Sequence, residues 1–148
     1  MDKLVIEGGK KLSGEVKISG AKNSALPIMA ATILTDEPCT IRNVPKLRDT
    51  LTMIQLLESL GKKVHYEKGK LTVLGNGPLK DTAHYDLVST MRGSFCVLGP
   101  LLAKLRRARV SLPGGCVIGV RPVDLHLKGL KALGAHIEIE NGYAVAKT

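Results

Sequence analysis

The chain has 148 residues, enough to bury the core of a single domain. It carries 22 Lys and Arg against 13 Asp and Glu, a formal net charge of +9, which favours anionic partners such as nucleic acid, acidic membrane or phosphorylated small molecules. The longest apolar run, residues 25–34, contains Pro27 and is too short to span a bilayer, and the charged start lacks the apolar centre of a signal peptide. We therefore expect a soluble, cytoplasmic protein with no membrane partner.

Nucleic acid is a weak candidate partner despite the positive charge. Single-strand binders stack bases on aromatic platforms, and no recognised nucleic-acid motif occurs here. The basic run at residues 104–109 is interpreted as the cationic end of a helix, where it complements the helix dipole. The aromatic residues are few and scattered singly: Tyr66, Tyr85, Phe95 and Tyr143.

The cysteines indicate neither a disulfide framework nor a structural zinc site, because Cys39, Cys96 and Cys116 are an odd number and form no Cys-x-x-Cys pair. Each is therefore either a packed small side chain or a working thiol. Cys39 and Cys96 are interpreted as packed, since free cysteine behaves as a small hydrophobe.

The first half of the chain predicts alternating strands and helices. A short strand at 15–18 leads into a helix over 22–34, and a further strand follows near Thr40. Apolar residues at helical spacing predict a second helix over 51–60, which the following glycine ends. The sequence VHYEKGKLTV then predicts a hairpin that turns at Lys68–Gly69.

The second half repeats this pattern. Residues 18–34 align with 88–104, where a helix over 89–105 is predicted, and the later hairpin turns at Asn141–Gly142. The predicted fold class is therefore α/β, built from two β-α-β-α-β-β units at about 15–75 and 85–148. Such units bury their faces against neighbours, so two copies are expected to leave a surface for a third.

Both copies place a cation at the start of their first helix. Lys22 stands beside Gly20 in the first copy, and Arg92 stands beside Gly93 in the second. A helix N-terminus offers free N–H groups and positive potential, so an added basic side chain makes an anion site. Asn23 could donate to a phosphate oxygen or cap the helix. The alternative is that both cations are simply solvated.

A glycine-rich connection in the second copy, PGGCVIGVRPVD, carries the third cysteine. Arg121 lies near Cys116 in the sequence, and a neighbouring cation lowers the pKa of a thiol toward the range useful for proton transfer. Pro122 and Asp124 suit the start of the next helix. A tight turn with a small residue in it remains the alternative, and His126 is interpreted as an ordinary exposed or packed helical residue.

Two stretches, SGAKNSALPIMAA and LPGGCVIGVRPVDLH, resemble the UDP-N-acetylglucosamine 1-carboxyvinyltransferase family of enolpyruvyl transferases, and the likeness runs along the whole chain. The resemblance implies an inside-out α/β barrel fold, with two domains of three repeats each and the active site between them. It implies that residues 1–20 are strands of the other domain and that 21–148 form part of one domain. The remainder, a third repeat and a second domain, is then an expected partner, and this portion alone is expected to be inactive.

The same resemblance implies site residues and a reaction. The enolpyruvyl group of phosphoenolpyruvate would pass to the 3′-hydroxyl of UDP-N-acetylglucosamine, with no organic cofactor and no metal. Cys116 would be the general acid and the residue that fosfomycin alkylates. Phosphoenolpyruvate would bind Lys22, Asn23 and Arg121. UDP-N-acetylglucosamine would bind Arg92, Arg121, Pro122, Val123, Asp124 and Leu125.

Three other functions remain open at this point. The sister family, 3-phosphoshikimate enolpyruvyltransferase, shares the repeated architecture but is not expected to carry the cysteine loop. A non-catalytic module that binds nucleotide sugars would keep the fold without the reaction. A basic repeat protein that binds nucleic acid through Arg106, Arg107 and Arg109 is the third alternative.

Overall fold

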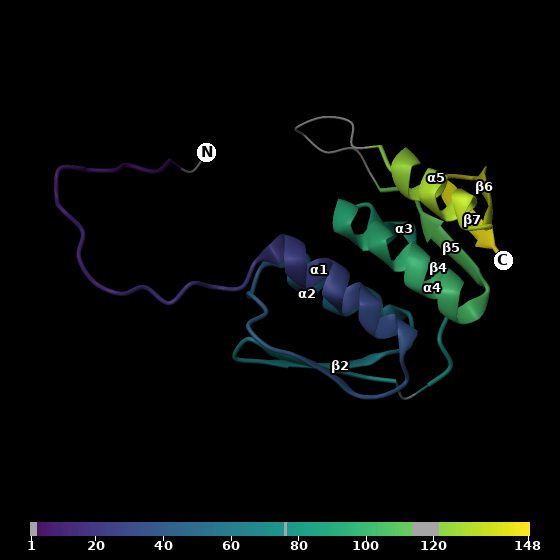
Figure 1. The fold of residues 1–148 in the computed structure, drawn as a ribbon, viewed down its shortest axis with the longest axis horizontal. Coiled ribbons are helices and arrows are strands. Elements are labelled where there is room, and N and C mark those ends of the chain that lie inside the picture. Colours follow the sequence, from purple (N-terminus) through teal and green to yellow (C-terminus); the bar gives the residue numbers. More distant parts are fainter. Residues whose placement is uncertain (1–2, 76, 114–121) are drawn as a thin grey trace.

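The computed structural model describes residues 3–75, 77–113 and 122–148, which form two groups of helices and strands (Figure 1). The first group comprises α1 (Lys22–Ala31), the 3-10 helix η1 (Thr32–Leu34), β1 (Cys39–Ile41), α2 (Arg48–Ser59), β2 (Lys63–Glu67) and β3 (Lys70–Leu74). The second group comprises β4 (Thr82–Ala83), α3 (Tyr85–Val88), the 3-10 helix η2 (Arg92–Val97), α4 (Leu98–Leu105), β5 (Arg107–Ser111), α5 (Asp124–Ala132), β6 (His136–Glu140) and β7 (Tyr143–Lys147).

Both groups contain the series helix, strand, helix and hairpin, from α1 to β3 in the first and from α4 to β7 in the second, whereas β4 and α3 have no counterpart in the first group. The first sheet has the strand order β1-β3-β2 with antiparallel neighbours. The second has the order β4-β5-β7-β6, in which β4 runs parallel to β5 and the other pairs are antiparallel. The α/β class is therefore confirmed.

Both predicted hairpin turns are present. Lys68 and Gly69 have φ angles of 47° and 78°, and Asn141 and Gly142 have 49° and 79°. Two consecutive positive φ angles define the type I′ turn, whose twist matches that of the paired strands. Gly61, at φ 104°, follows the end of α2 in the left-handed conformation expected of a glycine after a helix.

The predicted strand at 15–18 is wrong. Residues 3–21 contain no helix or strand, and Figure 1 shows this segment running away from the rest of the chain. A strand requires a partner for its backbone groups. Among the described strands β1 pairs with β3 alone, so residues 15–18 are not paired with it. Val16 and Ile18 are 79% and 77% exposed, so burial does not hold the segment in place either.

The continuous helix predicted over 89–105 is also wrong, because two shorter elements, η2 and α4, cover this region only from Arg92 onward. The chain is extended at Met91, between α3 and η2, with φ −151° and ψ 119°. The hydroxyl of buried Ser94 donates to the carbonyl of Val88 at 3.0 Å, which satisfies a backbone group where the helix is interrupted. Helical structure resumes as η2 and continues directly into α4.

The helices of the two groups share one core. α1 packs against η2 and α2, and η1 packs against α4, so each group covers apolar surface of the other. The two sheets lie outside these helices, with β2 below α1 and α2 and with β5 to β7 beside α4 and α5 in Figure 1. The largest side chains of this core with less than 2% exposure include Phe95, Met29, Ile33, Leu98 and Leu101.

Two lysines make polar contacts at the far end of α1, Lys62 within the first group and Lys104 between the groups. Lys62, which is 5% exposed, donates from Nζ to the carbonyl of Thr35 at 2.7 Å. Lys104 of α4 approaches the Oδ2 atom of Asp36 at 2.6 Å. Burial is the main cause that lowers the pKa of Lys62 below its ordinary value of 10.5, and the Lys104 ammonium acts in the same direction against the opposing Asp36 carboxylate.

Among the described residues, no helix is both long enough and apolar enough to cross a bilayer.

The lowered pKa of Lys62 predicts a specific pH dependence of stability. An unfolded lysine holds its proton more tightly than folded Lys62, so the free energy of unfolding should rise as pH increases from the lowered pKa toward 10.5. Lys62→Met removes this contribution. Urea unfolding between pH 8 and pH 10.5 should show the wild type gaining stability relative to the variant as pH rises. Lys63→Met, at the exposed neighbouring position, is the control. Parallel profiles for wild type and Lys62→Met would contradict the prediction.

Candidate functional site

The N-terminal ends of several helices face the same side of the molecule. In Figure 1, α1, α4 and α5 run in the same general direction, so their starts lie on one side. α4 continues from η2, which begins at Arg92, while α1 begins at Lys22 and α5 at Asp124. These are the helix starts at which the sequence predicts cations and a nucleotide-binding segment. Free N–H groups at such ends favour anions.

Lys22 is held at the start of α1 by an acidic residue from the neighbouring helix. Its Nζ atom lies 2.7 Å from the Oδ2 atom of Asp49, the second residue of α2, and the two side chains are 44% and 30% exposed. Asn23 is exposed in the first turn of α1. Gly20 precedes the helix where a Cβ atom would lie only 1.7 Å from the carbonyl oxygen of Asn43. The chain therefore enters α1 by a path that requires glycine.

Arg92 reaches across to the segment that precedes α5. Its Nη2 atom donates to the carbonyl oxygen of Pro122 at 2.9 Å. Three residues along η2, the ring of Phe95 meets the ring of His126 at a centroid distance of 6.0 Å and an interplanar angle of 88°. The structure thus brings together two regions that the sequence predicts for the same substrate.

The residues at the start of α5 differ in exposure. Val123 is 8% exposed, whereas Pro122 and Asp124 are exposed and Leu125 is 74% exposed. Asp124 is the acidic residue of the first turn, which suits the positive end of the helix. Cys116 and Arg121 lie outside the described residues.

The two helix starts are brought together by a close crossing of α1 and η2. A Cβ atom at Gly93 would lie 2.8 Å from the Cδ1 atom of Leu26, which is itself 5% exposed. Leu26 lies one turn after Lys22, and Gly93 directly follows Arg92. The absence of a side chain at Gly93 therefore allows the two predicted anion-binding helices to pack closely.

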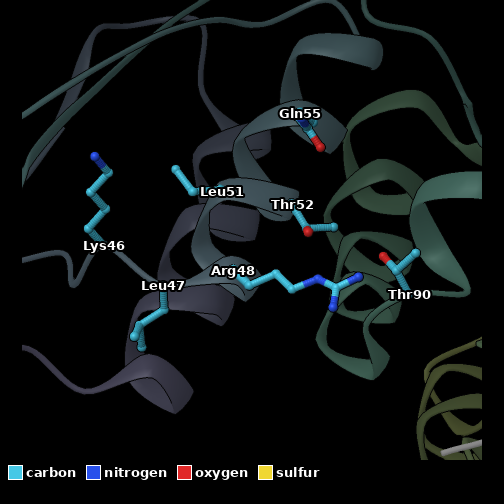
Figure 2. Close-up of a pocket in the computed structure, with 7 residues that line it drawn as sticks. All are labelled: Lys46, Leu47, Arg48, Leu51, Thr52, Gln55 and Thr90. Atoms are coloured by element: carbon cyan, nitrogen blue, oxygen red, sulfur yellow. The ribbon is translucent and has the colours of Figure 1, made fainter.

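A hollow of about 550 Å³ lies at the start of α2, next to these residues. Figure 2 shows the Arg48 side chain extending from the start of α2 toward Thr90. Thr52 lies one turn further along α2. Arg48 adjoins Asp49 in the chain, and Thr90 lies two residues before Arg92. Sequence reasoning missed this hollow, because its residues come from two segments and form no local motif. The other lining residues are Lys46, Leu47, Leu51 and Gln55.

Cys39 and Cys96 are partly exposed rather than fully buried. Cys96 packs against the core, and burial raises the pKa of its thiol while the nearby Arg92 guanidinium opposes the shift. The Sγ atom of Cys39 lies 3.7 Å from the carbonyl oxygen of Glu37. The prediction that both are packed side chains therefore holds in part. Within the described ranges, no group of three His, Cys, Asp or Glu side chains is placed to hold a metal ion.

The basic run at 104–109 makes contacts within the protein. Lys104 pairs with Asp36, as described above, and the Nε atom of Arg107 lies 2.7 Å from the Oδ2 atom of Asp81. The guanidinium carbon of Arg109 lies 4.1 Å from the centroid of the Tyr143 ring. Only Lys104 belongs to the last turn of α4, and the arginines at 107 and 109 are on β5. These contacts disfavour a nucleic-acid patch.

Comparison with known proteins identifies the family. The sequence profile of EPSP synthase (3-phosphoshikimate 1-carboxyvinyltransferase) matches residues 6–148. The chain belongs to the EPSP synthase family. Proteins named UDP-N-acetylglucosamine 1-carboxyvinyltransferase from Methylacidiphilum infernorum (isolate V4) and Acinetobacter guillouiae are 56% and 59% identical to it over 99% of this chain. This chain spans only 34% and 35% of their lengths.

Solved structures of this family have the same fold. The enolpyruvyl transferase NikO from Streptomyces tendae superposes with a TM-score of 0.77 at 25% identity, over 95% of this chain and 31% of its own. EPSP synthase from Acinetobacter baumannii gives a TM-score of 0.63 at 19% identity, over 91% of this chain and 32% of its own. The predicted enolpyruvyl transferase fold is therefore confirmed.

The crossing of α1 and η2 predicts how substitutions at Gly93 and Leu26 combine. Gly93→Ala should lower the free energy of unfolding by about 1–3 kcal/mol through overpacking, and Leu26→Ala by about 2–5 kcal/mol through a cavity. In the double variant the added methyl group has room, so the loss should be smaller than the sum by at least about 0.5 kcal/mol. Urea unfolding of the four proteins gives this coupling.

A control substitution comes from α5. A Cβ atom at Gly129 meets nothing within 4 Å, so Gly129→Ala should stabilise the protein by about 0.5–1 kcal/mol through helix propensity. Strictly additive losses at Gly93 and Leu26 would mean that the contact does not limit the approach of the two helices.

Proposed function

We propose that these residues form part of an enzyme that transfers the enolpyruvyl group of phosphoenolpyruvate to the 3′-hydroxyl of UDP-N-acetylglucosamine. The hydroxyl gives up its proton to a base and adds to C2 while C3 gains a proton, and the subsequent loss of a proton from C3 and of phosphate from C2 leaves the enol ether product. Relatives that carry this activity in their name and share more than half of their aligned residues with the chain support the proposal. This reaction would be the first committed step of peptidoglycan synthesis and would take place in the cytoplasm. The enzyme would thereby contribute to cell-wall growth and cell division.

The observation that carries the proposal is the hydrogen bond from Arg92 to the carbonyl of Pro122. Thirty residues separate the two in the chain, and the family resemblance assigns both to the sugar nucleotide. Their contact places η2 beside the start of α5. A ligand that carries both a diphosphate and a nucleoside is long enough to contact both segments. In this proposal Val123, Asp124 and Leu125 complete the nucleotide contacts.

Lys22 and Asn23 would bind the phosphate of phosphoenolpyruvate. Both lie in the first turn of α1, where the backbone N–H groups and the helix dipole add positive potential. The Asp49 carboxylate holds the Lys22 ammonium in place through a partly exposed ion pair, which contributes about 1 kcal/mol or less. A phosphate group with two negative charges could therefore replace this weak partner.

Two roles remain predictions from the sequence. Cys116 would protonate C3 as general acid and would also form a covalent thioketal with the substrate, and Arg121 would bind both substrates. A thiol has an ordinary pKa of about 8.5, so an acid form is available at neutral pH without a large shift. Both residues lie outside the described part of the chain.

The remaining part of the relatives' length would supply the other wall of the site. Residues 1–20 would then be strands of the second domain, and residues 21–148 would lie across the interdomain active site from it. A reaction between two substrates requires both to be oriented and water to be excluded, which one wall does not achieve. We therefore expect the 148-residue chain to bind ligands weakly and not to turn over.

A chimera tests the proposed activity. The 148 residues are joined to the region that follows the matched segment in the Acinetobacter guillouiae relative, and phosphate release from phosphoenolpyruvate is measured. We expect release with UDP-N-acetylglucosamine and none with shikimate 3-phosphate. The isolated 148-residue chain is the matched control, and it should release no phosphate. Release with shikimate 3-phosphate alone would assign the sister activity instead, and binding of the sugar nucleotide without any release would indicate a non-catalytic binding module.

Substitution of Cys116 in the same chimera separates proton donation from covalent chemistry. Cys116→Ser should lose turnover and labelling by fosfomycin while the fold is retained. Cys116→Asp should keep turnover, because a carboxylic acid also donates a proton, and it should resist the epoxide. An inactive Asp variant would show that the nucleophilicity of the thiol is itself required. Turnover and epoxide labelling by mass spectrometry are measured in parallel, with circular dichroism as the check on folding.

A further inference from the structure

We infer that His126 is a positioning residue that, together with Arg92, fixes the first turn of α5 on η2. The resemblance assigns Arg92 to the ligand and gives no role to His126. The inference rests on the proposed function only for the identity of the ligand, UDP-N-acetylglucosamine, that the segment Pro122–Leu125 would bind. The positioning itself is a property of the protein without ligand.

Burial holds the start of α5 mainly through one side chain, Val123, which directly precedes the helix and is 8% exposed. No residue of α5 is buried, and its packing against a neighbouring element is mainly against β6, the strand that follows it in the chain. Leu127 and Leu130 touch the core but are only partly buried. Leu125, in the first turn, is 74% exposed. Burial of apolar surface therefore anchors this helix only weakly.

Two contacts with η2 act on this first turn. The Nη2 atom of Arg92 donates to the carbonyl oxygen of Pro122 at 2.9 Å. The ring of Phe95 meets that of His126 edge to face, at 6.0 Å and 88°, within the range of favourable aromatic pairs. Phe95 is 2% exposed, so its ring is a fixed reference surface supplied by the core.

The geometry of the two helices explains why both contacts form together. η2 is a 3-10 helix with three residues per turn, so Arg92 and Phe95 lie above one another on the same face. Pro122 lies two residues before α5 begins, and His126 is the third residue of the helix. The two contacts therefore lie on either side of the helix start. The pair of contacts restrains both the position and the rotation of the first turn of α5.

Hydrogen–deuterium exchange of the ligand-free 148-residue chain tests the positioning directly. In His126→Ala the amides of residues 127–130, the first of which donates to the carbonyl of Val123, should exchange about two- to tenfold faster, the range expected for loss of one aromatic pair. His126→Phe keeps an aromatic ring for the contact and should exchange as the wild type does. His136→Ala, at an exposed histidine on β6, is the matched control and should leave these amides unchanged. Unchanged exchange in His126→Ala would overturn the inference.

Titration with UDP-N-acetylglucosamine separates positioning from direct ligand contact. If His126 positions the segment, the dissociation constant should rise about two- to tenfold in His126→Ala and return to the wild-type value in His126→Phe. Equal weakening in both variants, with normal exchange in His126→Phe, would mean that the imidazole touches the ligand and would overturn a positioning role. If the wild type does not bind the nucleotide at all, the proposed function fails, and the exchange experiment still decides the inference.

Discussion

The site depends first on the contact between Leu26 of α1 and the bare backbone of Gly93 in η2. A Cβ atom on Gly93 would come within 2.8 Å of the Leu26 side chain, so glycine allows the two helices to approach more closely than any other residue could. Lys22 lies one turn before Leu26, and Arg92 lies directly before Gly93. A shift at this crossing would therefore move the two cations relative to each other.

The sequence repeat explains why such a crossing exists. Each unit contributes a helix with one face on its own sheet, and the other face has to be covered by a neighbour. Here α1 packs against η2, and η1 packs against α4, so the first helices of the two units cover each other. The helices α1, α4 and α5 start on the same side of the molecule. The proposed anion site would therefore combine helix starts from both units.

Local patterns in the sequence predicted the parts of the fold that depend on local interactions. The turns at Lys68–Gly69 and Asn141–Gly142 form because few other residue pairs adopt two positive φ angles easily. The strand at 15–18 was also predicted from a short stretch of sequence, yet a strand requires a partner as well, and none of the described strands pairs with it. The helix over 89–105 failed because Met91 is extended between α3 and η2. Sequence periodicity does not report such tertiary constraints.

The candidate site shows the same division. Lys22 and Arg92 were found because they recur at matching positions, but their partners, Asp49 and the carbonyl of Pro122, come from distant segments and carry no local signal. The hollow beside Arg48 was missed for the same reason. Cys116 and Arg121 lie outside the described residues. Predictions for them remain those of the sequence.

The two cations of the proposed anion site have different partners in the protein without ligand. Lys22 is neutralised by the Asp49 carboxylate, a full charge, whereas Arg92 is engaged by a neutral carbonyl and keeps its net charge. An incoming phosphate would have to displace Asp49 from Lys22, at a cost of about 1 kcal/mol or less for a partly exposed pair. It need not displace Pro122 from Arg92, because a guanidinium has five N–H donors and this contact uses one nitrogen. Arg92 can thus hold the start of α5 and attract an anion at the same time, whereas Lys22 has to exchange one partner for another.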